Sequence, residues 1–203
     1  MKPQLFVFFG RSGCGKGTQA NLLTKYLDET DPKAGVFYVS TGDEFRKLIN
    51  GDTYTGKKLK DIVDGGQFAP EFLASMLWAN VMTRDYKEGM HMIIDGSPRK
   101  IPEALVFDSV APFYGFGKVK MIFMNVSAEW ATDKALKRAE AQGRKDDTVE
   151  AVAKRMKAFD DFLYPVILSY KNRDDVDFSE INGEQSIEQV HAEIMSALNL
   201  KNE

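Results

Sequence analysis

An apolar run that ends in a glycine-rich loop most strongly limits how this chain can fold. Residues 5–9 (LFVFF) contain no polar side chain, which is typical of a strand buried in a parallel sheet. Residues 10–18 read GRSGCGKGT, and a helical pattern begins at about Lys16. A strand, a glycine-rich loop, a lysine and a helix in this order predict an α/β fold with a phosphate-binding site at its first turn.

The loop follows the phosphate-binding pattern G-x-x-x-x-G-K-[ST] with one change. Gly10, Gly15 and Lys16 fit the pattern, but Gly17 follows the lysine and Thr18 stands one place late. The glycines allow backbone N–H groups to converge on an anion, and the N-terminus of the following helix adds positive potential. We therefore expect Lys16 to contact the β- and γ-phosphates of a bound nucleotide.

The rest of the chain alternates between strand and helix patterns. Further strands are predicted at residues 36–40, 91–95, 119–126 and, from its position, 176–181. Helices are predicted at residues 71–86, 127–142, 149–170 and 186–198, with Pro165 kinking the third. Thr41 and Glu44 have the spacing of a capping box, so a helix should also begin there. Repeated βα units over residues 1–203 predict a single domain, with a five-stranded parallel sheet between two layers of helices.

Composition excludes several other classes of protein. The chain has 27 Lys and Arg against 30 Asp and Glu, a net charge of −3, which provides no basic field for binding nucleic acid. No apolar run approaches the ~18 residues of a membrane span. The single cysteine excludes an internal disulfide and a cysteine-based zinc cluster. We expect a cytoplasmic enzyme or binding protein, with no nucleic acid and no membrane among its partners.

Five segments, in order along the chain, resemble the motifs of nucleoside monophosphate kinases and of adenylate kinases in particular. They are GRSGCGKGTQA at 10–20, STGDEFR at 40–46, HMIIDGSPR at 91–99, KRAEAQGRKDD at 137–147 and AKRM at 153–156. Ser12 replaces the usual proline, and Ser97 replaces the usual phenylalanine. The resemblance implies a P-loop kinase fold with a helical monophosphate-binding insertion at 41–69 and a short lid loop at 138–148. Short-lid members lack the zinc-binding lid of some relatives and are often monomers.

The resemblance also implies two nucleotide sites beside each other. ATP is expected to bind at Gly13, Cys14, Gly15, Lys16, Gly17, Thr18, Lys134 and Arg138. AMP is expected to bind at Thr41, Arg46, Gly96, Arg99, Glu103, Arg144 and Arg155. Asp95 ends an apolar strand, as in kinases whose aspartate holds Mg²⁺, here through water and with the ATP phosphates. No zinc is expected.

The cations of these sites suit phosphoryl transfer. The transition state spreads negative charge over the equatorial oxygens, so catalysis consists mainly of positioning and cationic stabilisation. The expected catalytic residues are Lys16, Arg99, Arg138, Arg144 and Arg155. Cys14 lies between two glycines, and we interpret it as a small filler rather than a nucleophile.

Two positions depart from the family pattern and bear on the substrate. Glu103 stands where adenylate kinases usually have a glutamine that reads adenine. An ionised carboxylate can only accept hydrogen bonds, so it suits the two donors of guanine better than the acceptor and donor of adenine. Against this, Thr41 matches adenylate kinases. Lys134 stands where an arginine often packs over the ATP adenine, and a lysine cannot stack as a plane.

The predicted reaction is transfer of the γ-phosphoryl of Mg·ATP to AMP, giving two ADP. One alternative is a UMP/CMP or GMP kinase, which would differ only in the acceptor pocket. Another is a non-catalytic P-loop nucleotide-binding switch. A switch needs no second phosphate site, so Arg46 and Arg99 argue against it.

Overall fold

A five-stranded parallel sheet forms the centre of the computed structural model, which describes residues 2–143 and 148–200. The strands are β1 (Leu5–Gly10), β2 (Val36–Ser40), β3 (His91–Asp95), β4 (Val119–Asn125) and β5 (Val176–Asn182). Their order is β2-β3-β1-β4-β5, and every neighbouring pair is parallel. This confirms the predicted fold class. The order reverses at β1, so its carboxyl end opens the crevice where ligands bind in sheets of this kind.

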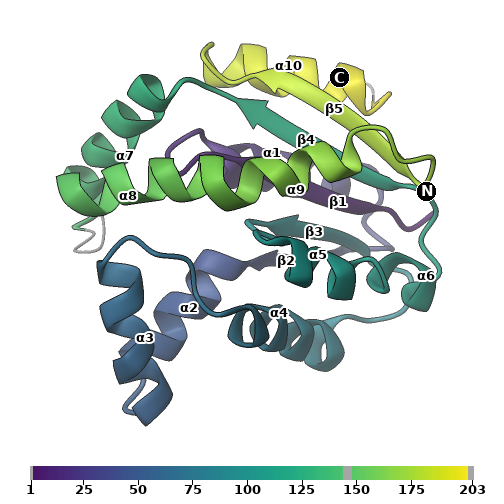
Figure 1. Ribbon diagram of the computed structural model, residues 1–203. Coiled ribbons are helices and arrows are strands. Elements are labelled where there is room, and N and C mark those ends of the chain that lie inside the picture. Colours follow the sequence, from purple (N-terminus) through teal and green to yellow (C-terminus); the bar gives the residue numbers. More distant parts are fainter. Residues whose placement is uncertain (1, 144–147, 201–203) are drawn as a thin grey trace.

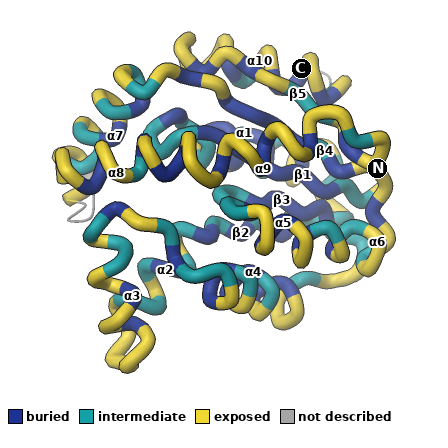
Figure 2. Tube along the Cα trace, viewed as in Figure 1, coloured by how far each residue is buried: buried dark blue, intermediate teal, exposed yellow. Residues whose placement is uncertain are grey.

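Helices cover both faces of the sheet (Figure 1). They are α1 (Lys16–Thr30), α4 (Glu71–Asp85), α5 (Ile101–Phe107), α6 (Val110–Tyr114), α7 (Ala128–Gln142), α8 (Val149–Ala158), α9 (Tyr164–Tyr170) and α10 (Ile187–Ala197). Alternate residues of β1 enter different cores: Leu5, Val7 and Phe9 pack on the α4, α5 and α9 side. Phe6 and Phe8 pack on the α1, α7 and α10 side. β1 is therefore buried on both faces, and the exposed residues gather mainly on the outer helices (Figure 2).

Two further helices, α2 (Thr41–Asn50) and α3 (Tyr54–Asp64), stand apart from the sheet at the lower left of Figure 1. They lie within the predicted insertion at 41–69. With the start of α4 they form a small core of their own. The expected cap at Thr41 is wrong by one residue: Ser40 accepts the Asp43 N–H at 3.3 Å. Thr41 is instead fully buried, and its hydroxyl is satisfied by donating to Ser97 Oγ at 2.9 Å.

The predicted helix at 149–170 contains an internal break. Between α8 and α9 the chain forms one π-helical turn, η1 (Phe159–Leu163), in which the Tyr164 N–H bonds to the Phe159 carbonyl. The predicted kink at Pro165 is therefore preceded by a change of helix type. This turn places Pro165 in the first turn of α9, where a missing N–H is tolerated.

No helix in the described part of the chain combines the length and apolar character needed to cross a bilayer. The predicted lid at 138–148 includes residues 144–147, which lie outside the described residues. Arg144, a predicted site residue, is one of them.

Candidate active site

A cavity of about 670 Å³ lies at the carboxyl ends of the strands. Its wall includes most of the residues predicted for the two nucleotide sites: Gly13, Cys14, Gly15, Lys16, Gly17, Thr18, Arg46, Asp95, Gly96, Arg99, Lys134, Arg138 and Arg155. These residues come from the loop after β1, from α2, from the segment after β3, and from α7 and α8. The sheet therefore brings together side chains that are up to about 140 residues apart in the sequence.

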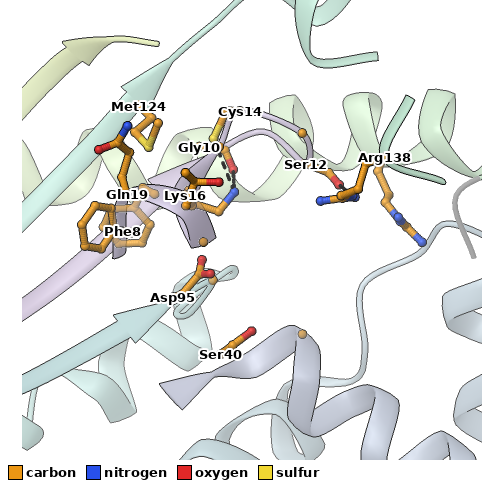
Figure 3. A pocket seen from close by; sticks show the side chains of 18 of the residues that line it. Phe8, Gly10, Ser12, Cys14, Lys16, Gln19, Ser40, Asp95, Met124 and Arg138 are labelled. Atoms are coloured by element: carbon orange, nitrogen blue, oxygen red, sulfur yellow. Dashed lines mark hydrogen bonds between the residues drawn. The ribbon is translucent and has the colours of Figure 1, made fainter. Parts of the chain in front are cut away.

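The loop between β1 and α1 has a backbone that only glycine adopts easily. Gly13 and Gly15 have φ angles of 94° and 92°. A Cβ on Gly13 would come within 2.3 Å of the Ala131 carbonyl, so this glycine also allows the loop to pack on α7. Lys16 Nζ donates to the Gly10 carbonyl at 2.8 Å (Figure 3) and to the Arg11 carbonyl at 3.0 Å. The loop thus holds the ammonium group in the cavity wall.

Asp95, the last residue of β3, provides carboxylate oxygens to the same cavity (Figure 3). The Tyr38 hydroxyl donates to Asp95 Oδ2 at 3.2 Å. Burial, followed by the negative charge of Asp95, raises the pKa of Tyr38 well above its usual range, so the phenol remains a donor. The carboxylate of Asp95 and the hydroxyl of Thr18 are oxygen ligands of the kind that Mg²⁺ or its water shell prefers. These residues fit the expected metal.

Several arginines contribute positive charge to the cavity. Burial lowers the pKa of Arg99, the charges of Glu103 and Asp95 raise it, and those of Arg155 and Arg46 lower it again. Arg155 and Arg46 are therefore close enough to Arg99 to repel it. Cations that repel one another in a partly enclosed site favour the entry of an anion such as phosphate. Arg138 reaches the loop from α7, where its Nη2 donates to Ser12 Oγ at 3.3 Å (Figure 3).

Two predicted AMP-binding residues lie outside the cavity wall. Glu103 is 2% exposed, and its Oε1 accepts the Trp78 indole N–H at 3.2 Å. Its Oε2 accepts the backbone N–H of Arg99 at 2.8 Å. Both oxygens are therefore occupied inside the protein, and this geometry does not support direct contact with the acceptor base. Thr41 is likewise occupied, by Ser97. Lys134 does line the cavity, with its ammonium 5.1 Å from the centre of the Trp130 ring.

Other residues in the wall were not predicted from the sequence. On the α2–α3 side these are Phe45, Ile49, Val63, Gln67, Phe68 and Ala69. On the opposite side, Gly183, Gln185 and Ile187 lie just beyond β5. The second group follows the carboxyl end of a parallel strand, and that rule alone indicates these positions. The first group carries no local signal, because its members other than Gln67 are apolar and look like ordinary core.

Known proteins resemble this chain over most of its length. A family model described as adenylate kinase matches residues 8–175. The chain belongs to the adenylate kinase family. An adenylate kinase of Stenotrophomonas maltophilia is 31% identical over 193 residues, which cover 95% of this chain and 97% of that protein. Adenylate kinase 1 of a Nostoc species is 33% identical with the same coverage, and the adenylate kinase of Phocaeicola vulgatus is 31% identical over 192 residues, covering 95% and 96%.

Membership of the adenylate kinase family confirms the resemblance inferred from the five motifs. It identifies the chain as a phosphotransferase of the kinase class and removes the non-catalytic switch from the alternatives. As an adenylate kinase, the chain is expected to use Mg·ATP as its phosphoryl donor.

Proposed function

We propose that this adenylate kinase transfers the γ-phosphoryl of Mg·ATP to AMP, giving two ADP, within the cavity at the carboxyl ends of the strands. The observation that carries the proposal is the convergence of Lys16, Asp95 and several arginines from separate elements in one cavity. A cavity of about 670 Å³ with cations on more than one wall suits two phosphorylated ligands rather than one.

ATP occupies the half of the cavity next to the glycine-rich loop in this proposal. The backbone at Gly13, Cys14, Gly15, Gly17 and Thr18 surrounds its phosphates, and Lys16 and Arg138 provide the positive charges. The base lies between α7 and the segment beyond β5, near Lys134 and Gln185. Lys134 lies over Trp130, so the planar surface at this position is an indole and not a guanidinium.

AMP occupies the half next to the α2–α3 insertion, which serves as the monophosphate-binding unit. Arg46 and Arg99 bind its phosphate, and the segment at Gly96 brings backbone close to it. Arg155, and Arg144 by family resemblance, bind phosphate between the two nucleotides. Thr41 acts indirectly, by holding Ser97 beside the Arg99 segment. The short segment at 138–148 acts as the lid.

In-line attack by a phosphate oxygen of AMP on the γ-phosphoryl of ATP accounts for the kinds of side chain in the cavity. The attacking phosphate oxygen is already ionised, so no side chain has to act as a general base, and no covalent enzyme intermediate is required. Lys16 and the arginines stabilise the charge that develops on the transferred group. Bound Mg²⁺ would neutralise part of the phosphate charge, and Asp95, oriented by Tyr38, would hold it through water.

We further propose that the enzyme works as a cytoplasmic monomer. The residues assigned to both nucleotides come from one chain and one cavity, so no second copy is required to complete the site. Sedimentation velocity with saturating nucleotides tests this proposal, with a single monomeric species expected.

A coupled assay of ADP formation from ATP with AMP, GMP, CMP or UMP tests the proposed reaction. We expect AMP to be the best acceptor. Preference for GMP or a pyrimidine nucleotide would overturn the assignment of the acceptor but leave the kinase intact. Failure to phosphorylate any of the four would overturn the reaction itself.

A further inference from the structure

Glu103 is a carboxylate with an unusual environment. It lies in the first turn of α5 and is 2% exposed, beneath the segment that carries Arg99. A buried carboxylate is costly unless its oxygens receive hydrogen bonds. Here Oε1 accepts from the Trp78 indole at 3.2 Å, and Oε2 accepts from the Arg99 backbone N–H at 2.8 Å.

Arg99 is fixed at several points besides its backbone. Its Nε donates to the Gly96 carbonyl at 2.6 Å, and its guanidinium lies 5.3 Å from the centre of the Phe68 ring. The remaining edge, formed by Nη1 and Nη2, is the part that can bind a phosphate in two parallel hydrogen bonds. Since such binding depends on direction, a shift of the Arg99 backbone would weaken it.

We propose that Glu103 is a positioning residue, which fixes Arg99 for the acceptor phosphate instead of reading the acceptor base. The inference rests on the proposed function, in which Arg99 binds the phosphate of AMP. Trp78 belongs to α4, whose first turns pack into the small α2–α3 core through Leu73 and Leu77. Glu103 therefore joins the Arg99 segment to the helix that supports the insertion. The negative charge of Glu103 also offsets the repulsion of Arg99 by Arg46 and Arg155.

The two roles predict opposite effects of replacing Glu103 with glutamine. A base reader would gain from the amide, because glutamine complements both the acceptor and the donor of adenine, and AMP would bind up to about tenfold better. If Glu103 is a positioning residue, the substitution should weaken AMP binding, because the amide has only one acceptor oxygen. In either orientation its NH₂ would face a donor, the Trp78 N–H or the Arg99 N–H. Removing the indole donor in Trp78→Phe should relieve that clash.

Equilibrium binding of three probes to the full chain separates the phosphate from the base. The probes are AMP, adenosine and ribose 5-phosphate, with ATP and GMP as reference ligands for the donor site and for the base, and they are measured with Glu103→Gln, Trp78→Phe and the double variant. We expect Glu103→Gln to lower the affinity for AMP and for ribose 5-phosphate about tenfold. The affinities for adenosine and ATP should stay within twofold of the wild-type values. The double variant should recover much of the loss. In steady-state kinetics the KM for AMP should rise while the KM for ATP does not.

Glu71→Gln is the matched control, because it makes the same change at a partly exposed carboxylate that pairs with Lys100 at 2.8 Å. It should leave all three probes unaffected. Glu103→Asp keeps two acceptor oxygens on a shorter side chain. It should weaken ribose 5-phosphate as well, and it replaces Glu103→Gln if the latter does not fold.

Three outcomes would overturn the inference. They are unchanged ribose 5-phosphate binding in Glu103→Gln, a change in adenosine binding or in the ratio of AMP to GMP affinity, or an equal loss of ATP and AMP affinity. Arg99→Lys separates this failure from failure of the proposed function. If Arg99→Lys weakens ribose 5-phosphate and Glu103→Gln does not, only the role of Glu103 is wrong. If neither does, Arg99 does not bind the acceptor phosphate.

Discussion

At the scale of single residues, Tyr38 shows how a neighbouring strand can prepare a metal-binding carboxylate. Val39 and Ser40 pair with Ile94 and Asp95 in the β2–β3 ladder, so Tyr38 and Asp95 are diagonal neighbours on one face of the sheet. The Tyr38 hydroxyl then reaches Asp95 Oδ2 at 3.2 Å. One carboxylate oxygen is held by the phenol, which fixes the direction in which the other can face a hydrated cation.

Replacing Tyr38 with phenylalanine removes this hydrogen bond, together with the interaction of the phenol with the Ser40 hydroxyl. Divalent-metal binding in the ATP complex should weaken roughly 3- to 10-fold, the worth of one hydrogen bond. Titration of Mn²⁺ followed by electron paramagnetic resonance measures this without relying on turnover. Tyr54→Phe, at an exposed position in α3, is the control and should have no effect. Identical Mn²⁺ affinity in Tyr38→Phe would show that Tyr38 does not position Asp95.

His91 gives the fold a dependence on acid. It is fully buried, its Nδ1 accepts the Gln4 N–H at 3.3 Å, and burial lowers its pKa although Asp31 opposes the shift. Below about pH 6.5, His91 therefore binds a proton in the unfolded chain but stays neutral in the folded chain. The free energy of unfolding should fall with pH below that value, by up to about 1.4 kcal/mol per pH unit. His91→Asn, which keeps an acceptor, should reduce the pH dependence of the free energy of urea unfolding between pH 7 and 5.5, and the part that remains belongs to His191, whose pKa burial also lowers. An unchanged slope would contradict the assignment to His91.

At the scale of the elements, the π-helical turn η1 is joined to the glycine-rich loop by Arg11. Its Nη2 pairs with Asp160 at 2.6 Å, its Nη1 donates to the Val126 carbonyl at 3.2 Å, and its guanidinium lies 4.1 Å from the centre of the Phe159 ring. The Arg11 carbonyl accepts from Lys16. A π-helical turn often marks a functional position, and here it adjoins α8, which carries Arg155.

Arg11→Met should therefore affect both stability and the ATP site. Loss of the ion pair with the exposed Asp160, of the hydrogen bond to the Val126 carbonyl and of the cation–π contact should lower the free energy of unfolding by about 1–2 kcal/mol, because solvent screens the ion pair. The KM for ATP should rise more than the KM for AMP, because the loop that holds Lys16 is loosened. Arg11→Lys keeps the charge but not the planar contacts, so its stability and its KM for ATP should lie between those of the wild type and Arg11→Met. Equal changes in both KM values would mean that Arg11 supports the fold in general.

The first four strands of the sheet could be predicted from the sequence because their signals are local, whereas β5 could be predicted only from its position after a helix. The pattern of runs such as 91–95, and that of the glycine-rich loop, predicts both the type of element and its position in the fold. The π-helical turn could not be predicted, because the apolar spacing across 149–170 is compatible with a continuous helix. The environment of Glu103 could not be predicted either, since it depends on Trp78, a residue 25 positions earlier on another helix. Arg144 lies outside the described residues, so its expected role remains a prediction.

At the scale of the whole molecule, the α2–α3 unit is expected to move relative to the sheet. Its apolar residues form a small core separate from the two main cores. Arg46 lies on α2, whereas Lys16 lies at the start of α1, so closure of the insertion and lid would bring their charges around the phosphates and exclude water. Two adenosines joined through five phosphates should bind tightly and reduce the radius of gyration in small-angle scattering. An unchanged scattering curve at saturation would count against closure.

The central claim is that the charge of Lys16 drives phosphoryl transfer between ATP and AMP in this cavity. The rate of ADP formation from ATP and AMP by the wild type and by Lys16→Met tests it most directly. Methionine matches lysine as far as Cε and lacks only the ammonium group, so the unfolding transition should stay near that of the wild type. The kcat should fall by at least ~100-fold, because the migrating phosphoryl loses its nearest cation. A folded Lys16→Met protein that retains a kcat close to that of the wild type would contradict the claim.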